Sequence, residues 1–335
     1  MTYTILMLSA SLVLVFVAAV IFVNAIEWIG CRLRLGGSFV GAILAPLFTS
    51  FPELTVFLVA VFAYNGKAGQ EIGIGTLFGQ PFMASSLSYG LVGVAVLIGY
   101  LIKKRTNTVL VVDKTLSIPY IFITVLFPLT LVPSFLGVSL IKHLFGLIFL
   151  GAFVYYIWLM YQRRMAELIE DASEPYFCKI APKTMPFLMT GAIVQLIVAV
   201  ILLYLGSKTM VHSVDVLATS IGISAMGLAL IIVPAATAIP ETTSALIWGY
   251  RGKDTLSIGS LVGEKILYST FYPALGLFLT SWVLDIHAYL SVIATTIISL
   301  ILLYYILKQR LPWYGLCFGL IFFVLYAVVI FAFRV

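Results

Sequence analysis

Residues 37–60 read GSFVGAILAPLFTSFPELTVFLVA, and residues 222–246 read GISAMGLALIIVPAATAIPETTSAL. Both segments are apolar except for a short polar interruption, and both contain the pattern Thr-x-x-Pro-Glu, at residues 49–53 and 237–241. Proline removes a backbone donor and clashes with the preceding turn of a helix. In lipid, such a break persists only where protein or a cavity satisfies the exposed backbone groups. A duplicated, broken and carboxylate-bearing apolar helix therefore predicts the central site of a membrane transporter.

The composition of the chain places it among polytopic membrane proteins. Of its 335 residues, 62% are hydrophobic and only 10% are charged, and the mean hydropathy is +1.16. No soluble domain has such a composition. The net charge of +6 would suggest a nucleic-acid partner in a soluble protein, but here the basic residues fall in short loops, so we predict none. The three cysteines are too few and too scattered for a disulfide framework or a metal cluster.

Ten apolar runs of about 20 residues predict an all-α polytopic membrane protein with ten transmembrane helices. The predicted spans are residues 3–28, 37–64, 70–101, 115–134, 137–161, 185–219, 222–249, 255–281, 284–307 and 311–333. One sizeable polar segment divides them into five and five. We therefore predict a first five-helix repeat at residues 1–161, a cytoplasmic connecting loop at residues 162–184 and a second five-helix repeat at residues 185–335.

The positive charges predict how the chain lies in the lipid bilayer. Most of the 19 Lys and Arg residues fall in loops on one predicted side, such as Lys103, Lys104 and Arg105, whereas Lys67 and Lys208 fall on the other. The basic side faces the cytoplasm, so both termini lie outside, and we expect the plasma (inner) membrane. Because each half has five spans, the two halves have opposite orientation. They form an inverted-topology repeat, whose site lies near the middle of the membrane.

The repeated segments resemble the cation/calcium exchanger superfamily, the sodium/calcium exchangers and their relatives. That family has two repeats, each with a G-T-S-x-P-E-like motif and then a helix with a G-N-x-x-G-S-N-like motif. Residues 48–53, FTSFPE, and residues 236–241, ATAIPE, match the first motif apart from the initial Gly and, in the second repeat, the Ser. Residues 75–81, GTLFGQP, and residues 259–265, GSLVGEK, depart further from the second motif. The chain is identified as a divergent member.

The resemblance implies a secondary active antiporter that moves calcium or a similar cation in exchange for sodium or protons by alternating access. Spans two, three, seven and eight would form a core around the cation site, and spans one and six would be the pair that moves. Inorganic cations are then the partners besides the bilayer, and no prosthetic group is implied. The oligomeric state stays open. Two alternative functions are a proton-coupled exchanger without sodium sites and a transport-inactive cation-sensing homologue.

Glu53 and Glu241 are the principal candidates for cation ligands. A carboxylate at that depth costs roughly 2.5–3.5 kcal/mol on insertion scales, so it is rarely retained without a partner. Calcium prefers six to eight oxygen ligands, including backbone carbonyls exposed at helix breaks. The alternative is a structural carboxylate hydrogen-bonded at a kink. The further predicted ligands are Thr49, Thr237, Ser50, Gln80 and Glu264, and the further predicted cavity-lining residues are Thr76 and Ser260.

Several of these further candidates have a structural alternative. Thr49 and Thr237 lie one helical turn before the two glutamates, but a threonine often bonds to a carbonyl of its own helix. Gln80 and Glu264 follow the second Gly of their G-x-x-x-G motifs, so the inverted repeat predicts that both face one cavity. The glycines themselves are expected to pack helices closely.

Lys265 is the strongest departure from the family pattern, because the family usually presents Asn or Asp there. It lies eleven residues past Asp254, roughly 16 Å into its span by helix rise. The alternative, an ammonium that snorkels to the interface, is difficult at that depth. We expect Lys265 to pair with Glu241 or Glu53 and to take the place of one transported monovalent cation.

Other function classes have little support in the sequence. The chain contains no H-E-x-x-H and no G-x-S-x-G motif, so we expect that it is not an enzyme. Lys208, His212 and Asp215 share one face of the sixth predicted span. This pattern is typical of a hydrated helix end more than of a proton relay.

Overall fold

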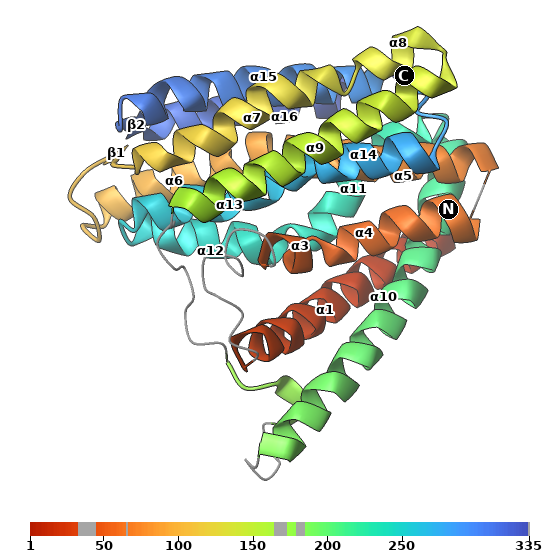
Figure 1. Cartoon of the computed structure of the whole chain (residues 1–335), viewed down its shortest axis with the longest axis horizontal. Coiled ribbons are helices and arrows are strands. Elements are labelled where there is room, and N and C mark those ends of the chain that lie inside the picture. Colours follow the sequence, from red (N-terminus) through yellow and green to blue (C-terminus); the bar gives the residue numbers. More distant parts are fainter. Residues whose placement is uncertain (33–44, 65, 164–172, 179–184, 334–335) are drawn as a thin grey trace.

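The computed structural model describes residues 1–32, 45–64, 66–163, 173–178 and 185–333 (Figure 1). Most of these residues are helical, as a segment must be when lipid offers its backbone no partners. The elements are, in chain order, α1 (Thr2–Arg32), α3 (Ala45–Thr49), α4 (Phe51–Leu58), η2 (Val59–Tyr64), α5 (Gly66–Met83), η3 (Ala84–Ser88), α6 (Tyr89–Leu101), β1 (Val109–Leu110), η4 (Lys114–Leu116), α7 (Ser117–Leu129), α8 (Val132–Leu136), α9 (Ser139–Arg163), η5 (Tyr176–Cys178), α10 (Met185–Ile221), α11 (Ala225–Thr237), α12 (Ile239–Tyr250), α13 (Asp254–Ser269), α14 (Phe271–Leu279), α15 (Ile286–Leu307), β2 (Leu311–Pro312) and α16 (Trp313–Phe333).

The described residues contain seven helices long and apolar enough to cross a membrane, or eight if the bent pair α11 and α12 is one span. The remaining predicted spans are interrupted. The second is divided between α3, α4 and η2, and the eighth is divided between α13 and α14. Residues 37–44 of the second predicted span and most of the predicted connecting loop lie outside the described residues. The ten-span inverted repeat therefore stays a prediction.

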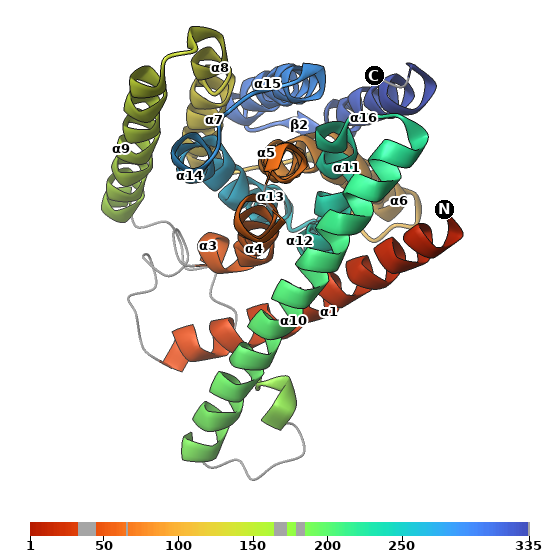
Figure 2. The same ribbon diagram turned by 90° about the vertical axis from the view of Figure 1, so that its right-hand side faces the viewer.

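Helix α5 lies in the middle of the molecule. Figure 2 shows it surrounded by α4, α11, α13, α14 and α15, and every residue from Ile72 to Met83 is buried. A Cβ atom at Gly75 would lie 2.5 Å from the Met226 carbonyl oxygen, and one at Gly79 would lie 2.5 Å from that of Leu230. The expectation of close packing is thus confirmed for this motif, because only glycine lets α5 approach the α11 backbone so closely.

Helices α1 and α10 pack along each other and form a pair on one side of the molecule (Figures 1 and 2). Their shared apolar core also includes residues of α4, η2, α5 and α11. Toward the start of α10, Gln195 donates from Nε2 to Asn24 Oδ1 of α1 at 2.9 Å. Asn24 Oδ1 also accepts from the Tyr176 amide at 3.0 Å, so this amide pair holds η5 against both helices.

One end of the molecule joins the loops that follow α6, α12 and α15. Strand β1 pairs antiparallel with β2, at the opposite end from both chain termini in Figure 1. Arg105 is buried there, donates to the Gly249 carbonyl at 2.6 Å and forms an ion pair with Asp254 at 3.2 Å. Several of the predicted cytoplasmic loops therefore meet at one end, while the orientation across the membrane stays a prediction.

Candidate functional site

Two helix breaks position the principal carboxylates. Between α3 and α4 the chain turns at Ser50, with φ −86° and ψ 5°, and between α11 and α12 it turns at Ala238, with φ −80° and ψ −3°. The axes of α11 and α12 differ by 63°. A proline occupies the first turn after each break, where no helical donor is needed. Glu53 and Glu241 consequently lie in the first turns of α4 and α12, where the helix dipole favours negative charge.

The structure brings Glu53, Glu241 and Glu264 together, and we call these three residues the acidic cluster. Glu53 is 1% exposed, and neither of its carboxylate oxygens has a hydrogen-bond partner among the described residues. One oxygen of Glu241 and one of Glu264 are likewise buried without a partner there. The three carboxyl groups lie close enough to repel one another when they are charged. The two helix breaks at the Thr-x-x-Pro-Glu motifs and α13 thus each contribute one glutamate to the same site.

Gln80 reaches the acidic cluster from α5. Its Nε2 donates to Glu264 Oε2 at 3.0 Å, while its Oε1 is buried without a partner among the described residues. The two equivalent positions therefore contact each other. The shared cavity that both were expected to face stays a prediction. The bond also orients the Gln80 amide, because the nitrogen faces Glu264 and the carbonyl oxygen faces elsewhere.

The threonine hydroxyls lie beside the acidic cluster but donate to their own helices. Thr49 Oγ1 donates to the Pro46 carbonyl at 3.2 Å, and Thr237 Oγ1 donates to the Val233 carbonyl at 3.2 Å. The Thr49 hydroxyl lies beside Glu264, and that of Thr237 lies beside Glu53. The predicted alternative, a hydrogen bond from each threonine to a carbonyl of its own helix, therefore accounts for the hydroxyl hydrogens. The lone pairs of the same oxygens remain able to contact a cation.

Ser50, Thr76 and Ser260 lie less directly at the site. Ser50 Oγ donates to the Pro46 carbonyl at 2.7 Å and lies 2.6 Å from the Tyr272 hydroxyl. Thr76 donates to the Ile72 carbonyl, and Ser260 donates to the Ser257 carbonyl. No hydrogen bond joins these three hydroxyls to the acidic cluster within the part of the chain that the structure describes.

Lys265 faces away from the acidic cluster. Its side chain is fully buried, its ammonium donates to Ser299 Oγ at 3.1 Å, and it lies 5.4 Å and 5.3 Å from the ring centroids of Tyr89 and Tyr120. We call these four residues the ammonium pocket. The expected pairing with Glu241 or Glu53 is wrong, because the helical step of about 100° per residue turns Lys265 toward α6, α7 and α15. Burial also excludes snorkelling.

Two tyrosines at the site were not predicted from the sequence. Tyr268 lies one helical turn after Glu264 on α13. Tyr272 lies in α14, after the interruption at Thr270, and the two ring centroids lie 4.5 Å apart. The Tyr268 hydroxyl lies within electrostatic range of all three carboxyl groups, and it is buried without a hydrogen-bond partner among the described residues. The signal that could have found Tyr268 is its spacing of one turn from Glu264 on the same helix, and the interruption at Thr270 leaves no such signal for Tyr272.

The resulting site is rich in acceptors. Among the described residues, four carboxylate oxygens, the Gln80 amide oxygen and the Tyr268 phenol oxygen are buried there without partners. The same residues include no group of three or more His, Cys, Asp or Glu side chains placed closely enough to hold a metal ion. In this conformation the oxygens lie near one another, but the carboxylates are not arranged so that they could all contact one metal ion.

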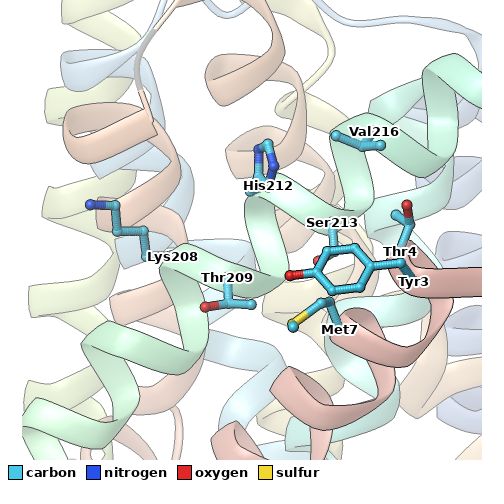
Figure 3. Close-up of a pocket in the computed structure, with 8 residues that line it drawn as sticks. All are labelled: Tyr3, Thr4, Met7, Lys208, Thr209, His212, Ser213 and Val216. Carbon is cyan, nitrogen blue, oxygen red and sulfur yellow. The ribbon is translucent and has the colours of Figure 1, made fainter.

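A separate cavity of about 420 Å³ lies between the start of α1 and the later part of α10. It is lined by Tyr3, Thr4, Met7, Lys208, Thr209, His212, Ser213 and Val216. Figure 3 shows Lys208 and His212 pointing in different directions, and Asp215 accepts from the Tyr64 hydroxyl at 2.5 Å. His212 Nδ1 also lies 3.5 Å from the Tyr64 hydroxyl, so His212 and Asp215 share Tyr64 as a partner, whereas Lys208 points away from His212. The hydrated helix end stays a prediction.

Comparisons with known proteins cover nearly the whole chain. The family profile described as "Sodium/calcium exchanger protein" matches residues 3–162 and 191–335. The provisionally named antiporter CaxA of Alkalimonas amylolytica is 25% identical over 283 residues, 83% of this chain and 81% of CaxA. The crystal structure of the H⁺/Ca²⁺ exchanger CAX has a TM-score of 0.73 and 17% identity over 98% of this chain and 81% of CAX. The sodium–calcium exchanger NCX_Mj soaked with 2.5 mM Na⁺ and 1 mM Sr²⁺ has a TM-score of 0.60 and 19% identity over 97% of each chain.

Proposed function

Because the chain belongs to the sodium/calcium exchanger protein family, we propose that it is an antiporter that moves calcium or a similar divalent cation in exchange for protons. It is an integral membrane protein with several apolar membrane-spanning helices. The names of CaxA, an antiporter, and of CAX, an H⁺/Ca²⁺ exchanger, support this direction. Sodium is the second candidate for the counter-ion, in keeping with the name of NCX_Mj.

The observation that carries the proposal is the set of buried oxygens without partners around the acidic cluster. Buried acceptors normally have hydrogen-bond partners, and leaving one without a partner costs about 1–3 kcal/mol. A divalent cation would satisfy several at once, since calcium takes six to eight oxygen ligands from carboxylates, amides and carbonyls. Glu53, Glu241 and Glu264 would supply the charge, and Thr49, Thr237 and Gln80 would supply neutral oxygens.

Protons are favoured as counter-ions because they compete for the same atoms. Three neighbouring carboxylates repel one another when all are ionised, so without a metal the site favours bound protons. A cation that enters would displace those protons, and protons that return would release the cation. This competition couples the two fluxes through one site. Cation uptake should therefore fall when the pH on the side of cation entry is lowered.

Lys265 bears on the choice between protons and sodium. We propose that its ammonium takes the place of one monovalent cation in the core of the protein, although it contacts Ser299 and two tyrosine rings and not the carboxylates. A fixed positive charge beside Glu264 lowers the attraction of the site for a further monovalent ion. Replacing Lys265 with Asn should increase the dependence of transport on sodium.

The alternating access that antiport requires has a candidate mechanism in the arrangement of helices. We propose that α1 and α10 move against a core of α4, α5, α12 and α13, within a ten-helix inverted repeat whose termini both lie outside the plasma (inner) membrane. The long contact of α1 with α10 supports treating them as one unit, and the apolar core that they share with α4, η2, α5 and α11 is where this unit would move against the rest. Ser50, Thr76 and Ser260 would line the path to the site.

The test is cation flux in proteoliposomes, with sodium and pH gradients imposed separately. We expect a pH gradient, alkaline on the side of cation entry, to drive calcium uptake at zero sodium gradient, and Lys265→Asn to respond more strongly to sodium than the parent. Calcium uptake driven by sodium alone in the parent would favour the second candidate. Absence of uptake under both gradients, with calcium binding retained, would favour a cation-sensing protein.

A further inference from the structure

The geometry points to the phenol oxygen of Tyr268 as a further ligand of the cation site and as a determinant of its selectivity between calcium and magnesium. This inference rests on the proposed function, because it concerns the same acidic cluster. It adds a residue outside the Thr-x-x-Pro-Glu and G-x-x-x-G motifs, from the half of α13 that follows Glu264.

The position of Tyr268 brings its hydroxyl to the carboxylates. Tyr268 lies one helical turn after Glu264, and its side chain is 1% exposed. Its ring contacts that of Tyr272, which bonds Ser50 at the break before Glu53. The hydroxyl lies within electrostatic range of Glu53, Glu241 and Glu264, which come from three different helices. Buried hydroxyl groups are normally hydrogen-bonded, yet this one has no partner among the described residues. A group that can both donate and accept is therefore held at the site with nothing to bind.

The neighbouring tyrosine explains why the Tyr268 ring stays in place. Tyr272 donates its hydroxyl to the Ser50 carbonyl at 3.1 Å and lies 2.6 Å from Ser50 Oγ. Its ring packs against that of Tyr268, with centroids 4.5 Å apart. The Tyr272 hydroxyl is thus used to attach α14 to the break between α3 and α4, and the Tyr268 hydroxyl is the one left for the site.

A phenol oxygen suits a site that alternates between protons and a cation. When the carboxyl groups bind no metal, the hydroxyl can donate to one of them, and when a cation is bound, its lone pairs can contact the metal. It adds a ligand without adding negative charge. Calcium accepts six to eight oxygens in flexible geometry, whereas magnesium requires six in an octahedron and usually keeps several waters. Loss of one protein oxygen should therefore weaken calcium binding more than magnesium binding.

The first experiment compares Tyr268→Phe with the parent and with Tyr156→Phe, a buried tyrosine of α9. The thermal unfolding midpoint of the purified protein is followed as calcium or magnesium is added, and an apparent Kd is obtained from the stabilisation. We expect Tyr268→Phe to bind calcium about tenfold more weakly, with a change of about twofold or less for magnesium. Tyr156→Phe should match the parent for both ions.

Equal calcium affinity in Tyr268→Phe and the parent, or an equal loss for both ions, would overturn the inference. If Tyr268→Phe fails to fold, Tyr272→Phe decides, with terbium(III) as a luminescent substitute for calcium. Bound terbium should still emit in this variant when tyrosine is excited, because the Tyr268 ring remains beside it, and calcium should displace the signal. Bound terbium that is not sensitised would contradict the inference.

Failure of the proposed function has a different signature. If the parent shows no stabilisation by calcium at any concentration, the cation site itself is wrong. If Glu53→Gln removes the stabilisation while Tyr268→Phe leaves it unchanged, the site stands and Tyr268 is not part of it. Stabilisation lost in Glu53→Gln and weakened selectively in Tyr268→Phe is the result that we expect.

Discussion

The acidic cluster and the ammonium pocket are adjacent in sequence and opposite in chemistry. Glu264 and Lys265 are consecutive residues of α13, but Glu264 faces α5 and two further carboxylates, whereas Lys265 faces a serine and two tyrosine rings. The two side chains do not neutralise each other's charge, because the helical step of about 100° between consecutive residues points them in different directions. Among the described residues, the acidic face has more acceptors than donors, and the basic face has an ammonium without a carboxylate. A site that exchanges cations needs the acceptors of the acidic face, and the nearby ammonium of the basic face changes how strongly that site attracts cations.

A buried cation that does have a carboxylate provides the strongest contrast with Lys265. Arg105 pairs with Asp254 and donates to Gly249, at the end of the molecule where β1 and β2 meet. Arg105→Ala should reduce the free energy of unfolding by about 3–5 kcal/mol, because it leaves Asp254 partly buried without its counter-charge. Thermal unfolding in detergent measures the effect. Lys104→Ala, at an exposed neighbouring position, should change little. Equal stability of the two variants would show that the ion pair contributes nothing.

A charge-neutral replacement tests the acidic side of the contrast. Glu264→Gln removes one negative charge and retains an acceptor for Gln80, so we expect calcium affinity to fall about tenfold, or about 1.4 kcal/mol. The matched control is Glu71→Gln, which removes an acid of α5 whose surface partner is Lys67. Calcium-dependent stabilisation of the two purified variants is compared. The contrast fails if both variants bind calcium as the parent does.

A substitution in the ammonium pocket should have a smaller effect than the two above, and it should raise stability where Arg105→Ala lowers it. Lys265→Met replaces a buried, unpaired ammonium with an apolar side chain of similar length, which should raise stability by about 1 kcal/mol. Calcium affinity should rise, by less than about threefold, because Lys265 contacts none of the carboxylates and acts on the site only through its charge. Unfolding midpoints without calcium and calcium titrations are measured on the same preparation. A large loss of stability would mean that the two rings and Ser299 more than offset the burial of the charge.

The sequence predicted the local features of this site better than its side-chain directions. The helix breaks follow from prolines and the meeting of Gln80 with Glu264 from the equivalence of two motifs, both of which are local patterns. The direction of Lys265 depends on which helices pack against each face of α13, and no local pattern contains that information. Tyr268 was missed for a related reason, since a tyrosine in an apolar helix looks like core until its hydroxyl is found without a partner.

The number of membrane spans is a second feature that local sequence patterns predict incompletely, here at the level of whole helices. Hydropathy predicted ten runs, but the described residues contain seven or eight helices that are long and apolar enough to cross a membrane. The interruptions at Ser50, Ala238 and Thr270 shorten the individual helices, and the first two directly precede Glu53 and Glu241. The features that mark function therefore weaken the pattern from which spans are counted.

The most direct test of the account is how much calcium the purified protein binds when Glu53 and Glu241 are neutralised singly and together. Equilibrium binding of radioactive calcium is measured for the parent, Glu53→Gln, Glu241→Gln and the double variant. If both glutamates serve one site, each single variant should lose the calcium that the parent binds at micromolar to millimolar concentration, and the double variant should lose no more. Retention of binding in either single variant, or losses that add in the double variant, would contradict a single shared site.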